Sequence, residues 1–177
     1  MGKIHIPDDV MLFCSLIFRD EAFKDNATSL LKERFGEVVF HSKPFAFDFT
    51  RYYEEELGRP LYRTILAFAK LAPRDSLVEV KIITNLIEAE LADKGRRRLN
   101  LDPGILTQEN ICLATTKPYS HRIYLGGGIW ADLTLMYKDS TYCPLRWTYP
   151  DYRSEEMINV FNFLRRLYKE KIRCLKA

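Results

Sequence analysis

The densest group of side chains able to do chemistry lies between Thr115 and Arg122, in a proline-containing stretch that joins two predicted strands. Loops carry binding and catalytic residues more often than the elements they connect. Lys117 and Arg122 could hold an anion, and His121, with a reference pKa near ~6.5, could take up or release a proton. Alternatively, both cations are solvated strand ends and the His121 ring donates to a backbone carbonyl.

Asn100 and Asp102 form a second polar pair. They flank Leu101, and residues two apart in an extended chain point to the same side. Such a pair could orient a ligand, or bind a metal or a ribose. Asp102 is also the first residue of Asp-Pro-Gly, a common turn sequence. The turn would explain Asp102 and leave Asn100 unexplained.

Asp48 is a third candidate, because it stands among Phe45, Phe47 and Phe49. A carboxylate in aromatic surroundings is expected to be desolvated and to have a raised pKa, which would suit an acid or a base. Asp48 could equally cap the short acidic helix expected to begin near Thr50.

Two further segments are compatible with a nucleic-acid partner. Arg96, Arg97 and Arg98 follow a predicted helix, where cations offset the negative helix end, and they could also contact phosphates. Aromatic side chains between residues 147 and 152 could stack on bases or close the edge of a core. Together the two segments suggest RNA association without catalysis.

The three glycines at 126–128 predict a hairpin turn. A phosphate loop would need a following Lys-Ser or Lys-Thr and would lead into a helix, whereas these glycines lead into a predicted strand. Glycine is the residue that turns with positive φ require.

The elements that must position these residues can be read from hydrophobic periodicity. Residues 10–18 are almost all apolar, which predicts a buried strand. Apolar residues at steps of three and four predict helices over residues 21–35 and 76–93, the second with a capping-box sequence at Ser76 and Glu79. Ser154 is expected to cap a long last helix.

Alternation and turn residues predict the remaining strands. They lie at residues 37–41, 61–71, 111–115, 123–125, 129–137 and 141–145. An extended segment is expected at 44–49, and a turn at 102–104 follows the stretch 99–101. The pattern predicts an α+β fold: one domain over residues 1–177, with a flexible head at 1–9 and about three main helices on a mixed, largely antiparallel sheet.

Composition narrows the class of protein. With 177 residues, 47% hydrophobic and 29% charged, the chain is expected to fold as a globular domain. A formal charge of +3 is too small to attract nucleic acid or a membrane by itself. The four cysteines are scattered singly, and the longest apolar run falls far short of the ~20 residues that span a bilayer. We therefore expect a cytoplasmic protein with no membrane partner, and the oligomeric state stays open.

Four segments read together carry a family resemblance. They are Pro44–Glu56, Asn100–Thr107, Tyr119–Gly126 and Trp147–Arg153. In this order they make nearly the whole chain similar to an uncharacterised prokaryotic family, domain of unknown function 4416. The resemblance implies no established activity, although a GTP-binding label on some members would extend to this chain. The sequence contains neither a Lys-bearing phosphate loop nor an Asn-Lys-x-Asp guanine motif.

These observations favour a small-ligand protein whose ligand is phosphorylated or otherwise anionic, and they leave open whether it is an enzyme. The hypothesis assigns three roles: the anion is held by Lys117 and Arg122, a proton is moved by Asp48 or His121, and the ligand or a divalent cation is oriented by Asn100 and Asp102. An RNA-associated module and a structural subunit of an oligomer are the alternatives. The sequence identifies no particular cofactor or metal. The hypothesis requires residues 48, 100–102 and 117–122 to meet at one concavity.

Overall fold

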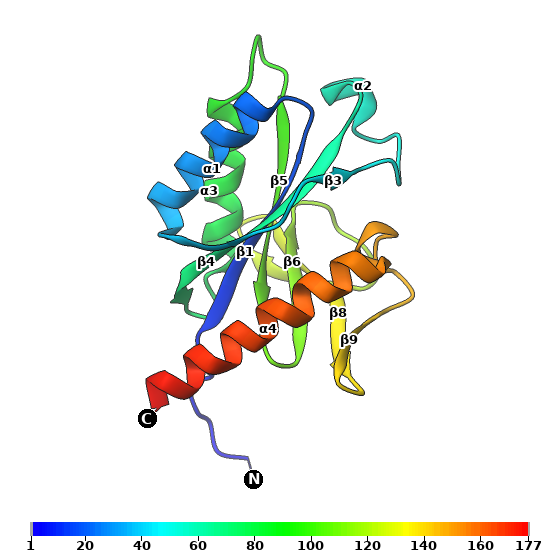
Figure 1. Ribbon diagram of the computed structural model, residues 1–177. Coiled ribbons are helices and arrows are strands. Elements are labelled where there is room, and N and C mark those ends of the chain that lie inside the picture. Colours follow the sequence, from blue (N-terminus) through cyan, green and yellow to red (C-terminus); the bar gives the residue numbers. More distant parts are fainter. Residues whose placement is uncertain (1, 177) are drawn as a thin grey trace.

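A computed structural model describes residues 2–176, and these residues form one antiparallel sheet with helices on both faces (Figure 1). The strands in this range are β1 (Val10–Phe18), β2 (Val38–His41), β3 (Phe45–Ala46), β4 (Tyr62–Ala72), β5 (Leu99–Leu106), β6 (Asn110–Thr115), β7 (Arg122–Gly126), β8 (Ile129–Lys138) and β9 (Thr141–Pro144). Their order is β2-β4-β1-β5-β6-β8-β7, with β3 beside β4 and β9 beside β8. The predicted α+β class is confirmed.

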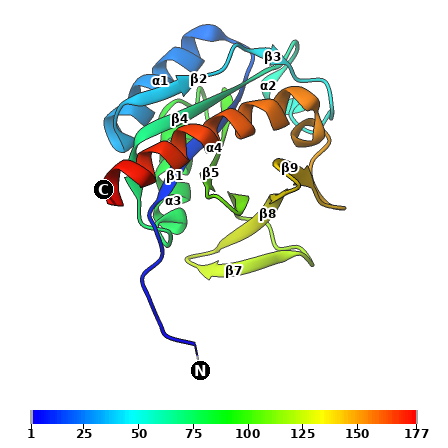
Figure 2. The same ribbon diagram turned by 60° about the horizontal axis from the view of Figure 1, so that its bottom comes forward.

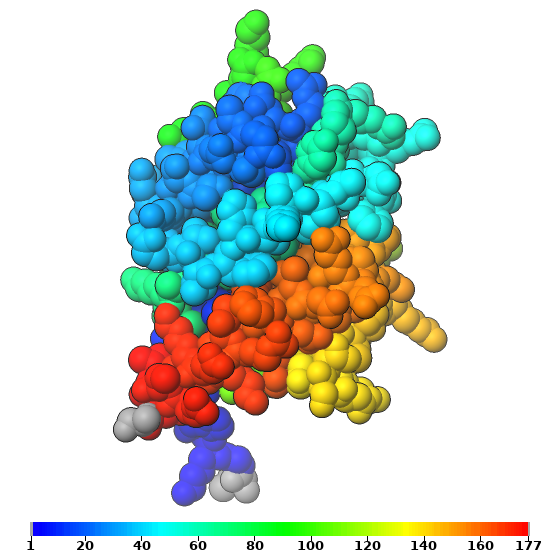
Figure 3. Space-filling model, viewed as in Figure 1, coloured from blue at the N-terminus to red at the C-terminus, as the bar shows by residue number. Residues whose placement is uncertain are grey.

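Helices α1 (Glu21–Phe35) and α3 (Leu77–Glu90) cover one face of the sheet, and α4 (Glu155–Lys176) crosses the other (Figures 1 and 2). The space-filling view shows α4 next to the chain around β2, where the Phe40 and Phe163 ring centroids are 5.4 Å apart (Figure 3). The chain also forms a fourth, short helix, α2 (Glu54–Leu57), before β4, and a 3-10 turn, η1 (Asp151–Arg153), before α4.

The central strand β1 divides the core into two layers. Val10, Leu12, Cys14, Leu16 and Phe18 belong to the cluster under α1 and α3, whereas Met11 and Phe13 pack with α4. Burial on both faces explains why this strand reads as a continuous apolar run and shows no alternation.

Side-chain caps begin two of the main helices, and the predicted cap at Ser154 is confirmed, whereas the cap of α1 at Asp20 is an additional finding. The Asp20 side chain accepts from the Ala22 N–H at 2.9 Å at the start of α1, and the Ser154 hydroxyl accepts from the Met157 N–H at 3.2 Å in α4. The predicted capping box at Ser76 is wrong, because the Ser76 side chain makes no cap hydrogen bond.

The predicted turn at residues 102–104 is also wrong, because β5 runs straight through it and pairs with β1 from Leu99 to Leu106. Gly104 serves a close approach instead: a Cβ there would lie 2.4 Å from Cζ of Phe13 and 2.7 Å from the carbonyl oxygen of Cys112. The glycine hairpin is confirmed between β7 and β8, with φ of 112°, 57° and 76° at Gly126, Gly127 and Gly128.

Within residues 2–176, no helix has the length and apolar character needed to cross a membrane. Residues 2–9 form neither helix nor strand. Their end is anchored to α4, because the Tyr168 hydroxyl donates to the Asp9 carbonyl at 2.6 Å and Lys176 pairs with Asp8 at 2.8 Å.

Candidate functional site

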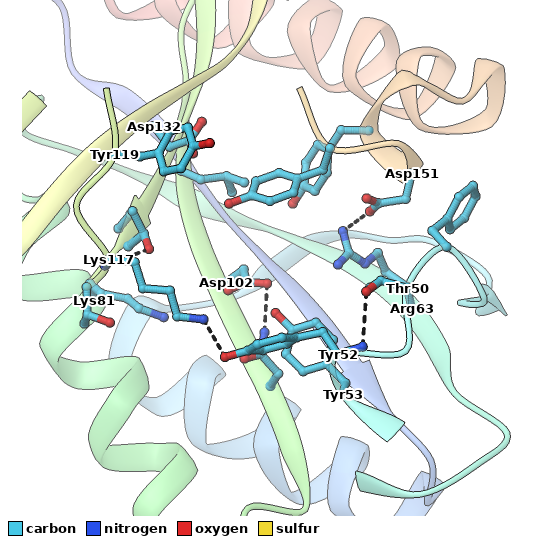
Figure 4. A pocket seen from close by; sticks show the side chains of 18 of the residues that line it. Thr50, Tyr52, Tyr53, Arg63, Lys81, Asp102, Lys117, Tyr119, Asp132 and Asp151 are labelled. Carbon is cyan, nitrogen blue, oxygen red and sulfur yellow. Dashed lines mark hydrogen bonds and ion pairs between the residues drawn. The ribbon is translucent and has the colours of Figure 1, made fainter. Parts of the chain in front are cut away.

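A pocket of about 910 Å³ opens where β5 and β6 separate (Figure 4). The two strands pair only from Gly104 to Leu106, so residues 99–103 of β5 and 114–115 of β6 have no partner on their facing sides. Pro103, which has no N–H to donate, is the residue directly before this ladder begins. The volume is within the range of small-molecule sites.

Because β5 and β6 separate here, side chains from both faces of the sheet line the pocket. Helix α3 contributes Lys81, Asn85 and Glu88 from one side, and the η1 segment contributes residues 149–152 from the other. The wall also includes the loop 116–119 and five residues of the segment 47–53, which are all but Asp48 and Arg51.

Four of the six predicted site residues line this pocket: Asn100, Asp102, Lys117 and Arg122. Asp48 and His121 are not among the lining residues. The predicted concavity therefore brings together residues from 100–102 and from 117–122, whereas Asp48 lies outside it.

The expected desolvation of Asp48 is wrong. Its side chain is exposed, because the chain turns Phe47 into a small cluster with Ile17 and Leu57 and leaves the next residue facing solvent. The alternative of Asp48 as a cap is wrong as well. The Thr50 hydroxyl accepts from the Tyr52 N–H at 3.1 Å, and α2 begins only at Glu54.

His121 lies beside the pocket wall and supports it. Its ring stacks on Trp147, with centroids 4.9 Å apart and an interplanar angle of 12°. Its Nε2 is 3.3 Å from the Oδ2 of Asp132, a buried lining residue. The alternative in which His121 donates to a backbone carbonyl is not what the structure shows.

Arg122 lines the pocket with every guanidinium nitrogen engaged. Its Nε donates to Asp132 at 2.9 Å, one Nη to the Lys117 carbonyl at 2.8 Å and the other to the Tyr149 hydroxyl at 2.7 Å. These bonds tie β7 and β8 to the loops on either side of the opening, so Arg122 holds the shape of the wall.

The other two arginines of the lining also have carboxylate partners. Arg63 pairs with Asp151, and both side chains are almost fully buried. Arg97 pairs with Glu56 and Glu88. Arg97 belongs to the run suggested for RNA phosphates, and Arg98, its neighbour, is paired with Asp93.

The two lysines of the lining differ from the arginines, because in the described part of the chain neither has a carboxylate oxygen within 4.0 Å. Nζ of Lys117 donates to the Tyr52 hydroxyl at 2.6 Å and lies 4.2 Å from the centre of that ring. Nζ of Lys81 donates to the Leu101 carbonyl at 2.8 Å, and this side chain is only 7% exposed. An ammonium group has three donors, so each lysine keeps donors for another partner.

Asp102 is the matching unpaired anion. It is joined to Asn100, whose Nδ2 donates to Oδ2 of Asp102 at 2.8 Å, as expected for residues two apart in a strand. No cationic nitrogen in residues 2–176 lies within 4.0 Å of its carboxylate oxygens.

Two deeply buried polar atoms of the wall have no hydrogen-bond partner among the described residues. They are Nε of Arg63 and the hydroxyl oxygen of Tyr152, whose residues are 3% and 1% exposed. Burial raises the pKa of the Tyr152 hydroxyl well above its ordinary value, so this group stays protonated. Both atoms are shielded from the open space of the pocket as well as from bulk solvent, so they do not offer donors to a ligand.

The burial of Glu88 is expected to make the free energy of unfolding depend on pH. Burial raises the pKa of Glu88, although Lys81 lowers it and the bond from the Leu101 N–H does the same. The folded chain then binds this proton more tightly than the unfolded chain, so the contribution to stability falls as pH rises from the ordinary glutamate pKa through the raised one.

We therefore expect wild type to lose stability relative to Glu88→Gln as pH rises through that interval, because glutamine cannot ionise. Urea unfolding of both proteins from pH 4 to 7 measures the difference. A difference that moves the other way with pH would mean that Lys81 and Arg97 outweigh burial.

Two charged residues of the wall, Arg63 and Lys81, were not among the sequence candidates, and Arg97 was a candidate only for RNA phosphates. Arg63 was visible as the charged residue inside the apolar stretch 61–69. Lys81, Asn85 and Glu88 recur at steps of four and three, a polar stripe beside the apolar stripe of α3. Arg97 carried no separate signal within its run of three arginines.

Comparison with known proteins gives one match. The family model described as Domain of unknown function (DUF4416) matches residues 8–168. No curated protein and no solved structure matches the chain.

Proposed function

The chain belongs to the DUF4416 family, and from the geometry of its pocket we propose that it binds an anionic small molecule between β5 and β6. The observation that carries the proposal is the pairing of charges in the wall. Each arginine of the wall has a carboxylate partner, whereas among residues 2–176 neither Lys81 nor Lys117 has a carboxylate oxygen within 4.0 Å. An anion placed between the two lysines would supply the missing partner.

The position of the lysines suits this role. Lys81 is buried on α3, where Glu88 interacts with it electrostatically but, within residues 2–176, no carboxylate oxygen lies within 4.0 Å of its Nζ. A buried ammonium group that is not directly paired favours a further anionic partner. Lys117 is exposed on the opposite loop, held near the opening by Tyr52 (Figure 4). The ligand would therefore meet one exposed cation at the entrance and one buried cation inside.

The rest of the wall fits a ligand that also has an apolar part. Its aromatic residues are Phe47, Phe49, Tyr52, Tyr53, Tyr119, Tyr149 and Tyr152. Apolar walls with a few convergent polar groups are the usual composition of small-molecule sites. A phosphorylated metabolite combines these features, and catalysis on it is part of the same hypothesis.

The proposal is tested by a thermal-shift screen of the purified protein with sugar phosphates, nucleotides, inorganic phosphate and divalent metals. A ligand at 100 times its Kd stabilises the fold by about 2.7 kcal/mol, which raises the Tm of a chain of this size by roughly 5–11 °C. We expect Lys117→Ala to weaken binding of the anion about tenfold, since charge-assisted hydrogen bonds contribute about 1.5–3 kcal/mol.

Lys138→Ala is the matched control, because Lys138 is an exposed lysine at the far end of β8 and outside the pocket. Its binding curve should coincide with that of wild type. If no anion shifts the Tm, or if Lys117→Ala and Lys138→Ala weaken binding equally, the pocket is not an anion site. Tight binding of RNA with a steep salt dependence would instead favour the nucleic-acid alternative.

A further inference from the structure

Two polar side chains of β5 in the pocket, Asn100 and Asp102, allow the ligand to be described further. We call them the polar floor of the pocket. Resting on the proposed function, we infer that the anion carries hydroxyl groups that bind Asp102, so that the ligand is a phosphorylated sugar or polyol. Asp102 acts as the acceptor, and Asn100 and Arg97 act as positioning residues behind it.

A chain of three groups fixes the carboxylate of Asp102. Arg97 donates from Nη1 to Oδ1 of Asn100 at 3.0 Å, and Asn100 donates from Nδ2 to Asp102 at 2.8 Å. Arginine can only donate and a carboxylate can only accept, so the amide of Asn100 has a single possible orientation. Arg97 is itself held by Glu56 and Glu88.

This arrangement leaves Asp102 with acceptor capacity for a ligand. An ionised carboxylate offers about four lone-pair sites, and one side-chain donor, Asn100, uses one of them. Asn100 is buried and Asp102 is half-buried at the pocket wall, so a donor brought by the ligand would bond there away from bulk solvent. Hydrogen bonds to a charged acceptor in such a place are the strong ones.

The charges already in the pocket favour a hydroxyl over an amine as the group that donates to Asp102. A hydroxyl donates without bringing a charge. An ammonium group would add a further cation to a pocket whose two lysines, within residues 2–176, have no carboxylate oxygen within 4.0 Å.

The charged groups that face this floor come from four elements. Asp151 of η1 pairs with Arg63 of β4, Glu88 and Lys81 of α3 bond the backbone of Leu101, and Asp102 itself lies on β5. Asp151 is paired with Arg63, and Glu88 is paired with Arg97 and accepts from the Leu101 N–H. Among these three carboxylates, only Asp102 has neither a cationic partner within 4.0 Å nor a backbone N–H donor in residues 2–176. The ligand's hydroxyls therefore have one defined acceptor.

Isothermal titration calorimetry with three probes tests the inference: inorganic phosphate, ribose 5-phosphate and ribose. We expect wild type to bind ribose 5-phosphate at least about tenfold more tightly than phosphate, because hydrogen bonds to a charged group contribute that much. Asp102→Asn should remove this preference and leave the affinity for phosphate unchanged. Retained phosphate binding also shows that the variant is folded.

Asn100→Ala is the second variant, and it separates positioning from general damage. Its affinity for ribose 5-phosphate should fall several-fold, with phosphate binding unchanged, and the double variant with Asp102→Asn should show no further loss. A structural role for Asn100 would weaken both probes alike.

The outcomes distinguish the two proposals. If wild type binds phosphate and ribose 5-phosphate equally, and Lys117→Ala weakens both, the anion site stands and the hydroxyl inference is overturned. If Asp102→Asn keeps the preference for ribose 5-phosphate, the inference is overturned too. If a divalent metal alone binds wild type but not Asp102→Asn, the carboxylate is a metal ligand and the inference is wrong. If no probe binds, both proposals fail.

Discussion

Replacing Asp151 by Ala is expected to lower the free energy of unfolding by about 3–5 kcal/mol, because it leaves the buried guanidinium of Arg63 without its counter-ion. Arg63 lies between two rings, 4.6 Å from the centre of Phe47 and 5.2 Å from that of Tyr152, so it cannot swing into solvent without unpacking them. Urea unfolding monitored by circular dichroism measures the change.

The double variant Arg63→Met with Asp151→Leu is the informative control. Replacing a buried ion pair by apolar side chains of similar volume is often neutral, so most of the lost stability should return. Glu37→Ala, which breaks an exposed pair with Lys32, should change stability by only about 0–1 kcal/mol. A loss in Asp151→Ala no larger than in Glu37→Ala would show that the Arg63 pair is solvated.

Gly104→Ala is expected to destabilise the fold by about 2–3 kcal/mol. The added Cβ would overlap Cζ of Phe13 and the carbonyl oxygen of Cys112, at 2.4 and 2.7 Å. Neither can retreat easily, because Phe13 packs edge-on against Phe161 and Cys112 belongs to the neighbouring strand. The same urea titration measures the effect.

Two further variants test the cause of this effect. Gly2→Ala adds a Cβ with no atom within 4 Å and should leave stability unchanged. Phe13→Leu in combination with Gly104→Ala should recover part of the loss, because it removes the ring but not the contact with Cys112. Full additivity of the two changes would mean that Phe13 and Gly104 do not interfere.

The parts of the fold that local sequence determines were predictable. Residues 21–35 carry an apolar stripe with an acceptor at Asp20 and a glycine at 36, and α1 has these bounds. The hairpin at Gly126–Gly128 follows from the φ values that only glycine adopts freely. The same-side arrangement of Asn100 and Asp102 follows from the period of two in a strand.

Other parts depend on contacts that local sequence does not contain. Asp-Pro-Gly has the composition of a turn, yet here Pro103 stands at the end of a ladder and Gly104 makes room for a ring of β1. The aromatic residues around Asp48 led to the wrong prediction that its carboxylate is buried. An alternating sequence does not show which of its two sides faces the core, and here Phe47 faces the core while Asp48 faces solvent. The sequence also does not show which cations are paired with carboxylates, since Asp151, the partner of Arg63, lies 88 residues away along the chain.

The position of β1 at the centre of the sheet determines how long this strand stays unpaired while the chain is synthesised. Its neighbours are β4 and β5, and the second ladder joins Phe18 to Leu99 and Met11 to Leu106. At a synthesis rate of about 5–20 residues/s, the apolar strand waits for seconds before its second neighbour leaves the ribosome. The charged residues on both sides of it, Asp8 and Asp9 before and Arg19, Asp20 and Glu21 after, are of the type that keeps such a nascent segment from aggregating.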